Sequence, residues 1–386
     1  MNLETLKKLL NISNRNTLYD EILKDFRSFN SLEYVQYNEL KISDGIIPVL
    51  KVANNLDINE IKTVKLFIGA QHNEYNGLFG ILDFFKILQK GEIKISDTLK
   101  NTQILIFMPL MNPYGFLNPQ KNNKSGYYLR NGENLNRFWR RAFVPEFENG
   151  MEDLDELPSP EQVKIVKDLL DDYWRNEKIS IYILDFHETS LIERFPIELN
   201  QNFSPYYKFD HWLKEGIIYN IIKLNNIRYS RKPLFVKCNP SADHTHINLT
   251  YEQVENVSEK LQEYLSKNLG VGKLPFYFCY GNKSRDYCRR LANLVYDKLK
   301  GKLWETYFPA FDHSFINHGC FINMSDATAR KNVISMELES QKQFFNIFDE
   351  IEKSKSELNY FEKKLDLINL SIELALETIK EMINLI

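Results

Sequence analysis

Cysteine is scarce in this sequence, and no two cysteines form a CxxC pair. Four are scattered over 386 residues: Cys238, Cys279, Cys288 and Cys320. Small secreted scaffolds hold their folds together with closely spaced cysteines, and this pattern does not match one. We expect free, partly buried thiols in a reducing compartment.

Long apolar runs are also missing. No segment approaches the roughly 18–20 consecutive apolar residues that a membrane helix needs. The first residues, MNLETLKKLLNISNRN, indicate an amphipathic helix and lack the apolar core and cleavage site of a secretory signal. These absences predict a cytoplasmic protein without a membrane partner.

Charge of either sign is not concentrated in one region. The net charge is -3 at pH 7, with 26% charged and 43% hydrophobic residues, which is ordinary for a globular protein. No Lys/Arg cluster extends along the chain as a nucleic-acid footprint would, so we expect no nucleic-acid partner. Because the length exceeds a typical single domain, we divide the chain into residues 1–60, 61–340 and 341–386.

Strand and helix signals alternate along most of the chain. Apolar residues at helical spacing predict helices, and continuous apolar runs predict strands buried on both faces of a parallel sheet. The expected strands are 34–43, 46–53, 63–68, 102–110, 179–186 and 332–339. The expected helices are 1 to about 30, 76–90, 159–176, 252–269 and 284–300. The fold class is therefore α/β, a mixed and largely parallel central sheet sandwiched by helices, with a helical extension over 341–386.

Two stretches are expected to be loops. Residues 111–158 are rich in Asn, Gly and Tyr, and a loop of that length is usually functional or disordered. Ser159 is a plausible N-cap for the helix that follows, with Pro160 at its first position. The segment DHTHIN, with His244 and His246, is interpreted as a polar loop.

Three of the expected strands end in clusters of polar and charged side chains. The first apolar run stops at Gly69 and is followed by QHNE, and the other two end in DFHE and MELE. In open α/β sheets, sites form outside the carboxyl ends of the strands. We therefore expect these ends to share one site. Its candidate residues are Gln71, His72, Glu74, Asp185, His187, Glu188, Glu337 and Glu339.

Five short motifs in order give this site a family resemblance. The motifs are G-x-H-x-x-E, N-P-x-G, G-x-D-x-N-R, D-x-H and a late Glu-Leu. The matching segments are Gly69–Glu74, Asn112–Gly115, Gly132–Arg137, Asp185–His187 and Glu337–Leu338. In this the chain resembles the zinc carboxypeptidase family, which includes pancreatic carboxypeptidases and, more distantly, succinylglutamate desuccinylase and aspartoacylase. Residues 61–340 are interpreted as the zinc carboxypeptidase-like catalytic domain.

The resemblance implies a Zn²⁺ site and leaves one of its ligands open. With Gly69 and Glu74 fixing the register, the implied ligands are Gln71, Glu74 and His187. A Gln in place of the first His looks like the atypical Gln-x-x-Glu site of the cell-shape-determining peptidoglycan D,L-carboxypeptidases. The alternative takes His72 as the ligand, through a one-residue deletion in the loop. A second departure is Asn134, which stands where the family motif has Asp.

The same resemblance implies roles for four further residues. Glu337 matches the general base, and Glu339, on the same face of a strand two residues later, is a second candidate. Arg130 matches an arginine that stabilises the oxyanion. Asn136 and Arg137 match the pair that binds the free carboxylate of a substrate, a task that suits the planar guanidinium fork.

The function implied is a zinc-dependent hydrolase that cleaves an amide bond next to a free carboxylate. Peptides or peptidoglycan-derived peptides are the expected substrates. The alternatives are a deacylase of small N-acyl amino acids and a non-catalytic, carboxypeptidase-like binding protein, which the Gln71 substitution keeps open. Residues 341–386 are expected to pack as helices, and a homodimer through them is possible. His313 and His318 lie in an expected specificity segment, and no motif marks a substrate-gating Tyr.

Overall fold

The fold is described from a computed structural model of the chain. Its described residues are 1–10, 14–54, 57, 59–95, 99–118, 126–143, 159–189, 206–209, 230–235, 243–250, 272–304, 310–312, 321–328, 330–341 and 358–385, with scattered single residues and short pieces of helix between 252 and 267.

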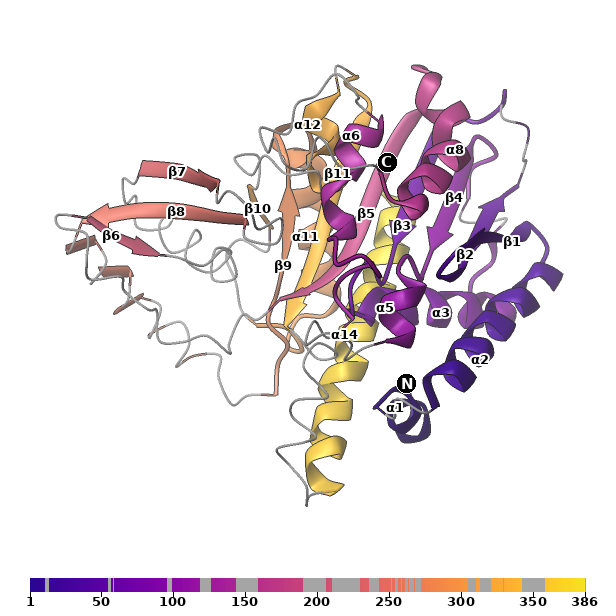
Figure 1. Ribbon diagram of the computed structural model, residues 1–386, viewed down its shortest axis with the longest axis horizontal. Helices are drawn as coiled ribbons and strands as arrows, with labels where there is room; N and C mark the ends of the chain where they lie inside the picture. Colours follow the sequence, from indigo (N-terminus) through magenta and orange to yellow (C-terminus); the bar gives the residue numbers. More distant parts are fainter. Residues whose placement is uncertain are drawn as a thin grey trace.

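An eight-stranded sheet forms the centre of the molecule (Figure 1). Its strands lie in the order β1-β2-β4-β3-β5-β11-β9-β10. The neighbours β4, β3, β5 and β11 run parallel, while β1, β2 and β9 pair antiparallel with their neighbours toward the centre. The bounds are β1 Val35–Ile42, β2 Gly45–Ala53, β3 Thr63–Ile68, β4 Gln103–Met108, β5 Ser180–Thr189, β9 Phe276–Tyr280, β10 Ala310–Asp312 and β11 Val333–Gln341. The predicted mixed, largely parallel α/β fold is confirmed.

Helices cover both faces of this sheet (Figure 1). One hydrophobic cluster joins the sheet to the first helical layer, and a second joins it to the other layer. The first layer comprises α1 Leu3–Leu10, α2 Arg15–Ser28, α3 Asn76–Gln89, α11 Arg285–Lys298 and α14 Leu358–Asn384. The second comprises α6 Trp139–Phe143, α8 Glu161–Arg175 and α12 Met324–Ala327. Residues of β3 and β4 are buried on both faces because each strand contributes to both clusters.

Two glycines let α3 approach its neighbours closely. A Cβ at Gly77 would lie 2.5 Å from the Cβ of Phe186 in β5. One at Gly80 would lie 2.6 Å from the Cβ of Ala375 in α14. Helix α3 is thereby wedged between the sheet and the C-terminal helix. Because α3 begins directly after the QHNE segment, this packing also fixes the position of that segment.

The C-terminal helix is tied to the sheet by a buried lysine. Lys65, in the middle of β3, is 2% exposed. Its ammonium donates to the carbonyl oxygens of Met382, Ile383 and Leu385 at 2.6, 3.0 and 2.8 Å. Met382 and Ile383 belong to the last turn of α14 and Leu385 follows its end, where carbonyl groups lack intrahelical partners. Strands β1 and β2, from residues 1–60, belong to the same sheet as the strands of residues 61–340. Helix α14, from residues 341–386, packs in the same hydrophobic core.

Several expectations about local structure were wrong. The predicted loop over 111–158 contains α5 Pro113–Leu117, the 3-10 helix η4 Leu135–Arg137 and α6. Residues 243–248 belong to β8 Asp243–Thr250, which pairs with β6 Tyr206–Phe209 and β7 Ser230–Phe235 in a second, three-stranded sheet. The N-cap of α8 is Pro160, so the predicted cap is one residue too early.

Other expectations are met or fall outside the described residues. Cys279 and Cys288 are free and buried, as expected. Most of the predicted helix over 252–269 lies outside the described residues, as do His313 and His318. Within the described ranges, no helix has the length and apolarity needed to cross a bilayer.

Candidate metal centre

The QHNE segment begins with a sharp change of direction after β3. Gly69 fits closely here, since a Cβ on it would lie 2.8 Å from the carbonyl oxygen of Pro109. Ala70 then adopts a positive φ of 48°, unusual for a residue with a side chain. Backbone bonds from Met111 to Gly69 and from Asn112 to Ala70 hold the turn against the neighbouring strand end. The turn brings the next four side chains into the interior, where each is at most 4% exposed.

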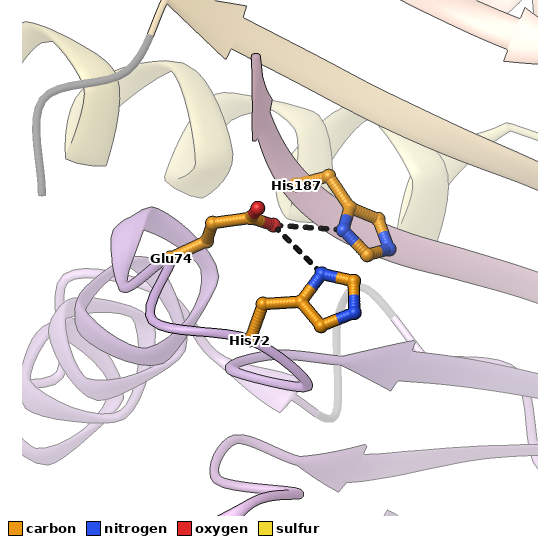
Figure 2. Close-up of side chains that lie close together, drawn as sticks. All are labelled: His72, Glu74 and His187. Atoms are coloured by element: carbon orange, nitrogen blue, oxygen red, sulfur yellow. Dashed lines mark hydrogen bonds and ion pairs between the residues drawn. The ribbon is translucent and has the colours of Figure 1, made fainter. Parts of the chain in front are cut away.

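Two of those side chains meet a residue at the end of β5. Figure 2 shows the rings of His72 and His187 pointing toward the carboxylate of Glu74. Nδ1 of His187 lies 2.8 Å from Glu74 Oε2, and Nδ1 of His72 lies 3.5 Å from the same oxygen. One ligand atom from each of the three residues fits within 4.8 Å of the others.

The outer nitrogen of each ring has its own acceptor. His72 Nε2 lies 2.9 Å from Asn134 Oδ1, and His187 Nε2 lies 2.9 Å from Asp185 Oδ2. An acceptor at Nε2 can hold the ring proton there, so that Nδ1 would offer its lone pair to a cation bound between the rings and Glu74. Metal-binding histidines are held in this way by a carboxylate or carbonyl behind the ring.

The donor set fits a zinc ion. Two imidazole nitrogens and one carboxylate oxygen are ligands that catalytic zinc uses, with a fourth position open to water. His72 Nδ1 is buried and has no hydrogen-bond partner within the described part of the chain, although it faces Glu74. A buried nitrogen left in this state is expected where a metal would bind.

Burial and neighbouring charges shift the proton affinities in the cluster. Burial would raise the pKa of Glu74, but the His72 and His187 rings outweigh it and hold that pKa below its usual range. Burial would lower the pKa of His187, but the carboxylates of Asp185 and Glu74 raise it well above its ordinary value. The cluster therefore concentrates negative charge around two imidazole rings, which is the electrostatic setting that a cation needs.

Gln71 has other partners. Trp139 Nε1 donates to its amide oxygen at 2.6 Å, and its amide nitrogen donates to Asp185 Oδ2 at 2.5 Å. These are the only hydrogen bonds of the Gln71 side-chain amide with described residues. The structure thus brings His72, the alternative first ligand, to Glu74 and His187. The preferred assignment of Gln71 stays a prediction without support from this geometry.

Glu337 lies on the strand next to Asp185 and His187. In the parallel pairing of β11 with β5, Glu337 is opposite Asp185 and Glu339 is opposite His187. Glu337 is 6% exposed, and burial is the main reason that its pKa is raised to about 7. Asn136 Nδ2 donates to Glu337 Oε1 at 3.5 Å and lies 3.3 Å from His187 Nε2.

The two predicted carboxylate-binding residues lie beside this group in η4. Asn136 accepts a hydrogen bond from the backbone of Phe321 at 3.4 Å, and Arg137 donates to the Asn136 carbonyl at 2.8 Å. Arg137 is 6% exposed and close enough to Glu337 for its positive charge to lower the pKa of that carboxyl. The structure therefore gathers Asn136, Arg137 and Glu337 around the metal-ligand cluster.

Arg130 is placed differently. Its side chain is 65% exposed and forms an ion pair of 2.6 Å with Asp44, and the guanidinium carbon lies 5.4 Å from the Tyr114 ring. Neither partner belongs to the cluster. The structure does not bring this predicted oxyanion donor to the cluster.

Sequence reasoning missed two aromatic partners of the site, Trp139, which donates to Gln71, and Tyr127. The ring of Tyr127 stacks on His72, with centroids 3.7 Å apart and planes at 17°. Burial is the main reason that the pKa of Tyr127 is raised, with the Glu74 charge adding to it. The sequence SGYYLR gives no signal for this role. Asn134 could have been found, because it occupies the Asp position of the D-x-N-R motif.

Comparisons with known proteins give similar structures but no sequence match. No protein-family model and no curated protein matches the chain. It is similar to bovine thrombin-activatable fibrinolysis inhibitor in complex with tick carboxypeptidase inhibitor, at 12% identity and a TM-score of 0.49, over 96% of this chain and 95% of that one.

Two bacterial structures are also similar. One is a metallo-carboxypeptidase from Burkholderia cenocepacia, at 11% identity and a TM-score of 0.46, over 94% of this chain and 68% of that one. The other is a metallo-carboxypeptidase from Pseudomonas aeruginosa in complex with (2-guanidinoethylmercapto)succinic acid, at 12% identity and a TM-score of 0.46, over 95% and 68%. Because these TM-scores are below 0.5, the function proposed below rests on this chain's own residues.

Proposed function

We propose that the protein is a zinc-dependent hydrolase that cleaves an amide bond next to a free carboxylate, with peptides or peptide-like molecules as substrates. The observation that carries this proposal is the convergence of His72, Glu74 and His187 within 4.8 Å. The buried carboxylate of Glu337 and the buried guanidinium of Arg137 lie beside them. The order of the five motifs along the chain supports it independently.

His72, Glu74 and His187 would hold the zinc ion. When bound, zinc polarises the scissile carbonyl and lowers the pKa of a water at its open position. The two imidazoles are neutral donors and the carboxylate supplies one negative charge, so a site of this composition keeps a net positive charge for that task. Asn134 and Asp185 fix the rings that present Nδ1.

Glu337 is the general base of the proposed reaction. Its carboxylate accepts a proton from the attacking water and then passes that proton to the leaving amine. A pKa of about 7 suits both transfers, because a group that titrates near the working pH is effective as base and as acid. Asn136 orients the carboxylate through its amide nitrogen.

Arg137, with Asn136, is proposed to bind the free carboxylate of the substrate. Its burial supports this role, because a guanidinium shielded from water pairs strongly with a carboxylate. Recognition of that kind restricts cleavage to the end of a chain. Arg130 is left out of the proposal, since its ion pair with Asp44 keeps it at the surface.

The test begins with metal analysis of protein purified without chelator. We expect one zinc per chain and hydrolysis of peptides that end in a free carboxylate, with far slower hydrolysis of the same peptides after terminal amidation. Absence of bound metal would leave the binding-protein alternative. Turnover of N-acyl amino acids without turnover of peptides would support the deacylase instead.

A further inference from the structure

The chemistry of its two partners fixes the orientation of the Gln71 amide. An indole N–H can only donate, so the atom that faces Trp139 must be the amide oxygen. An ionised carboxylate can only accept, so the atom that faces Asp185 must be the amide nitrogen. A glutamine binds a metal through its oxygen, and that oxygen is held by Trp139 at 2.6 Å.

Asp185 Oδ2 is the link between Gln71 and His187. It accepts from the Gln71 amide at 2.5 Å and from the His187 ring at 2.9 Å. Asp185 is completely buried, and its other oxygen has no hydrogen-bond partner within the described part of the chain. The position of this carboxylate therefore depends on few hydrogen bonds, and Gln71 supplies one of them.

We propose that Gln71 is a positioning residue and not a metal ligand. Buried hydrogen bonds run from Trp139 to Gln71, from Gln71 to Asp185 and from Asp185 to His187. This series of hydrogen bonds holds the His187 ring with Nδ1 directed at Glu74. The inference rests on the proposed zinc site and adds a role for the residue that departs from the family motif. His72 then supplies the ligand that the motif assigns to position 71.

A double-mutant cycle on zinc affinity separates the two roles. Gln71→Met keeps the length of the side chain and removes both hydrogen bonds. Loss of a group in direct contact with a ligand typically costs about 10–100-fold in metal affinity. Because Gln71 acts one contact further out, through Asp185, we expect a loss near the lower end of that range in competition with a chelator. In an Asp185→Ala background, Gln71→Met should have no further effect, because it acts through the missing carboxylate. A ligand would show its full loss in both backgrounds.

A second measurement guards against a failure of Asp185→Ala to fold. Cobalt bound to the wild-type protein and to Gln71→Met should give the same d–d spectrum, because the ligands are unchanged. His72→Ala should alter that spectrum or empty the site. Gln103→Met is the matched control, a buried glutamine at the opposite, amino end of β4, and it should leave both affinity and spectrum unchanged.

The outcomes that would overturn the inference are distinct from failure of the proposed function. If Gln71→Met changes the cobalt spectrum, or if its loss of affinity persists without Asp185, then Gln71 is a ligand and the zinc site still stands. If wild-type protein binds neither zinc nor cobalt, the proposed function itself fails, and with it the inference.

Discussion

Buried charge lies at two places near strand β3, one within the strand and one beyond its carboxyl end, and the two are satisfied in different ways. Lys65, in the middle of the strand, meets three fixed carbonyl oxygens at the end of one helix. The cluster beyond the carboxyl end of the strand joins ionisable side chains to one another, and leaves polar atoms of His72 and Asp185 without hydrogen bonds in the described structure. The first arrangement is complete in the folded chain, as expected for a structural role. The second is complete only with a ligand, which is why we interpret it as a site.

The largest effect is expected when a proposed ligand is removed. His187→Ala and Glu74→Ala should each abolish stoichiometric zinc, measured by metal analysis after gel filtration, because two protein ligands rarely hold a catalytic zinc. Lys65→Met should keep the metal, since it acts elsewhere. Full zinc occupancy in His187→Ala would place the site on other residues.

The next largest effect is expected at Glu337. Glu337→Gln should retain zinc and substrate binding but lose roughly 10²–10⁴-fold in kcat, because it removes the general base. Glu339→Gln is the matched control on the same strand and should retain most of the rate. Near-normal turnover in the first variant with an inactive second would move the role two residues along the strand.

Arg137 and Arg130 allow the same substitution at a buried and an exposed position. Arg137→Ala should lower kcat/KM for a peptide with a free terminus by roughly 30- to 5,000-fold, since truncating a buried charge partner costs about 2–5 kcal/mol. Arg130→Ala should change it only slightly, because an exposed ion pair contributes little. Equal cleavage of free and amidated peptides by the wild type would remove the carboxypeptidase interpretation.

The apolar pattern of each strand explains how well the sequence could predict it. The bounds of β3 were predicted to the residue, because continuous apolar runs are typical of strands buried on both faces. The strand β9 was missed, since its five residues, FYFCY, are too short for a period to show. The polar residues DHTHIN of strand β8 lack an apolar stripe and therefore predict a loop.

The site could be predicted as a location more readily than as a set of contacts. The ends of β3, β5 and β11 had to meet because parallel strands end at one edge. The choice between Gln71 and His72 could not follow from spacing, since it depends on the backbone turn at Ala70 and on the reach of Trp139. The position of Arg130 depends on Asp44, which is remote in sequence and carries no motif.

The smallest effect is expected at Lys65. The pH dependence of the free energy of unfolding tests whether its ammonium stays charged in the folded chain. Burial lowers the pKa of Lys65 to about 7 from its ordinary 10.5. Between those values the unfolded chain binds more protons than the folded one, so the free energy of unfolding should rise with pH, at most by roughly 1.4 kcal/mol per pH unit. Below about pH 7 this contribution should be constant.

The measurement is chemical denaturation of wild type and Lys65→Met from pH 6 to 9.5. Subtracting the variant removes the titration of other groups, and burial raises the pKa values of the nearby Tyr182 and Tyr287, which keeps them neutral in this range. We expect the difference in unfolding free energy to increase in favour of the wild type above about pH 7. A difference that is flat with pH would mean that the carbonyls of Met382, Ile383 and Leu385 keep the ammonium charged throughout. The lysine would then cap the last turn of α14 as a permanent cation.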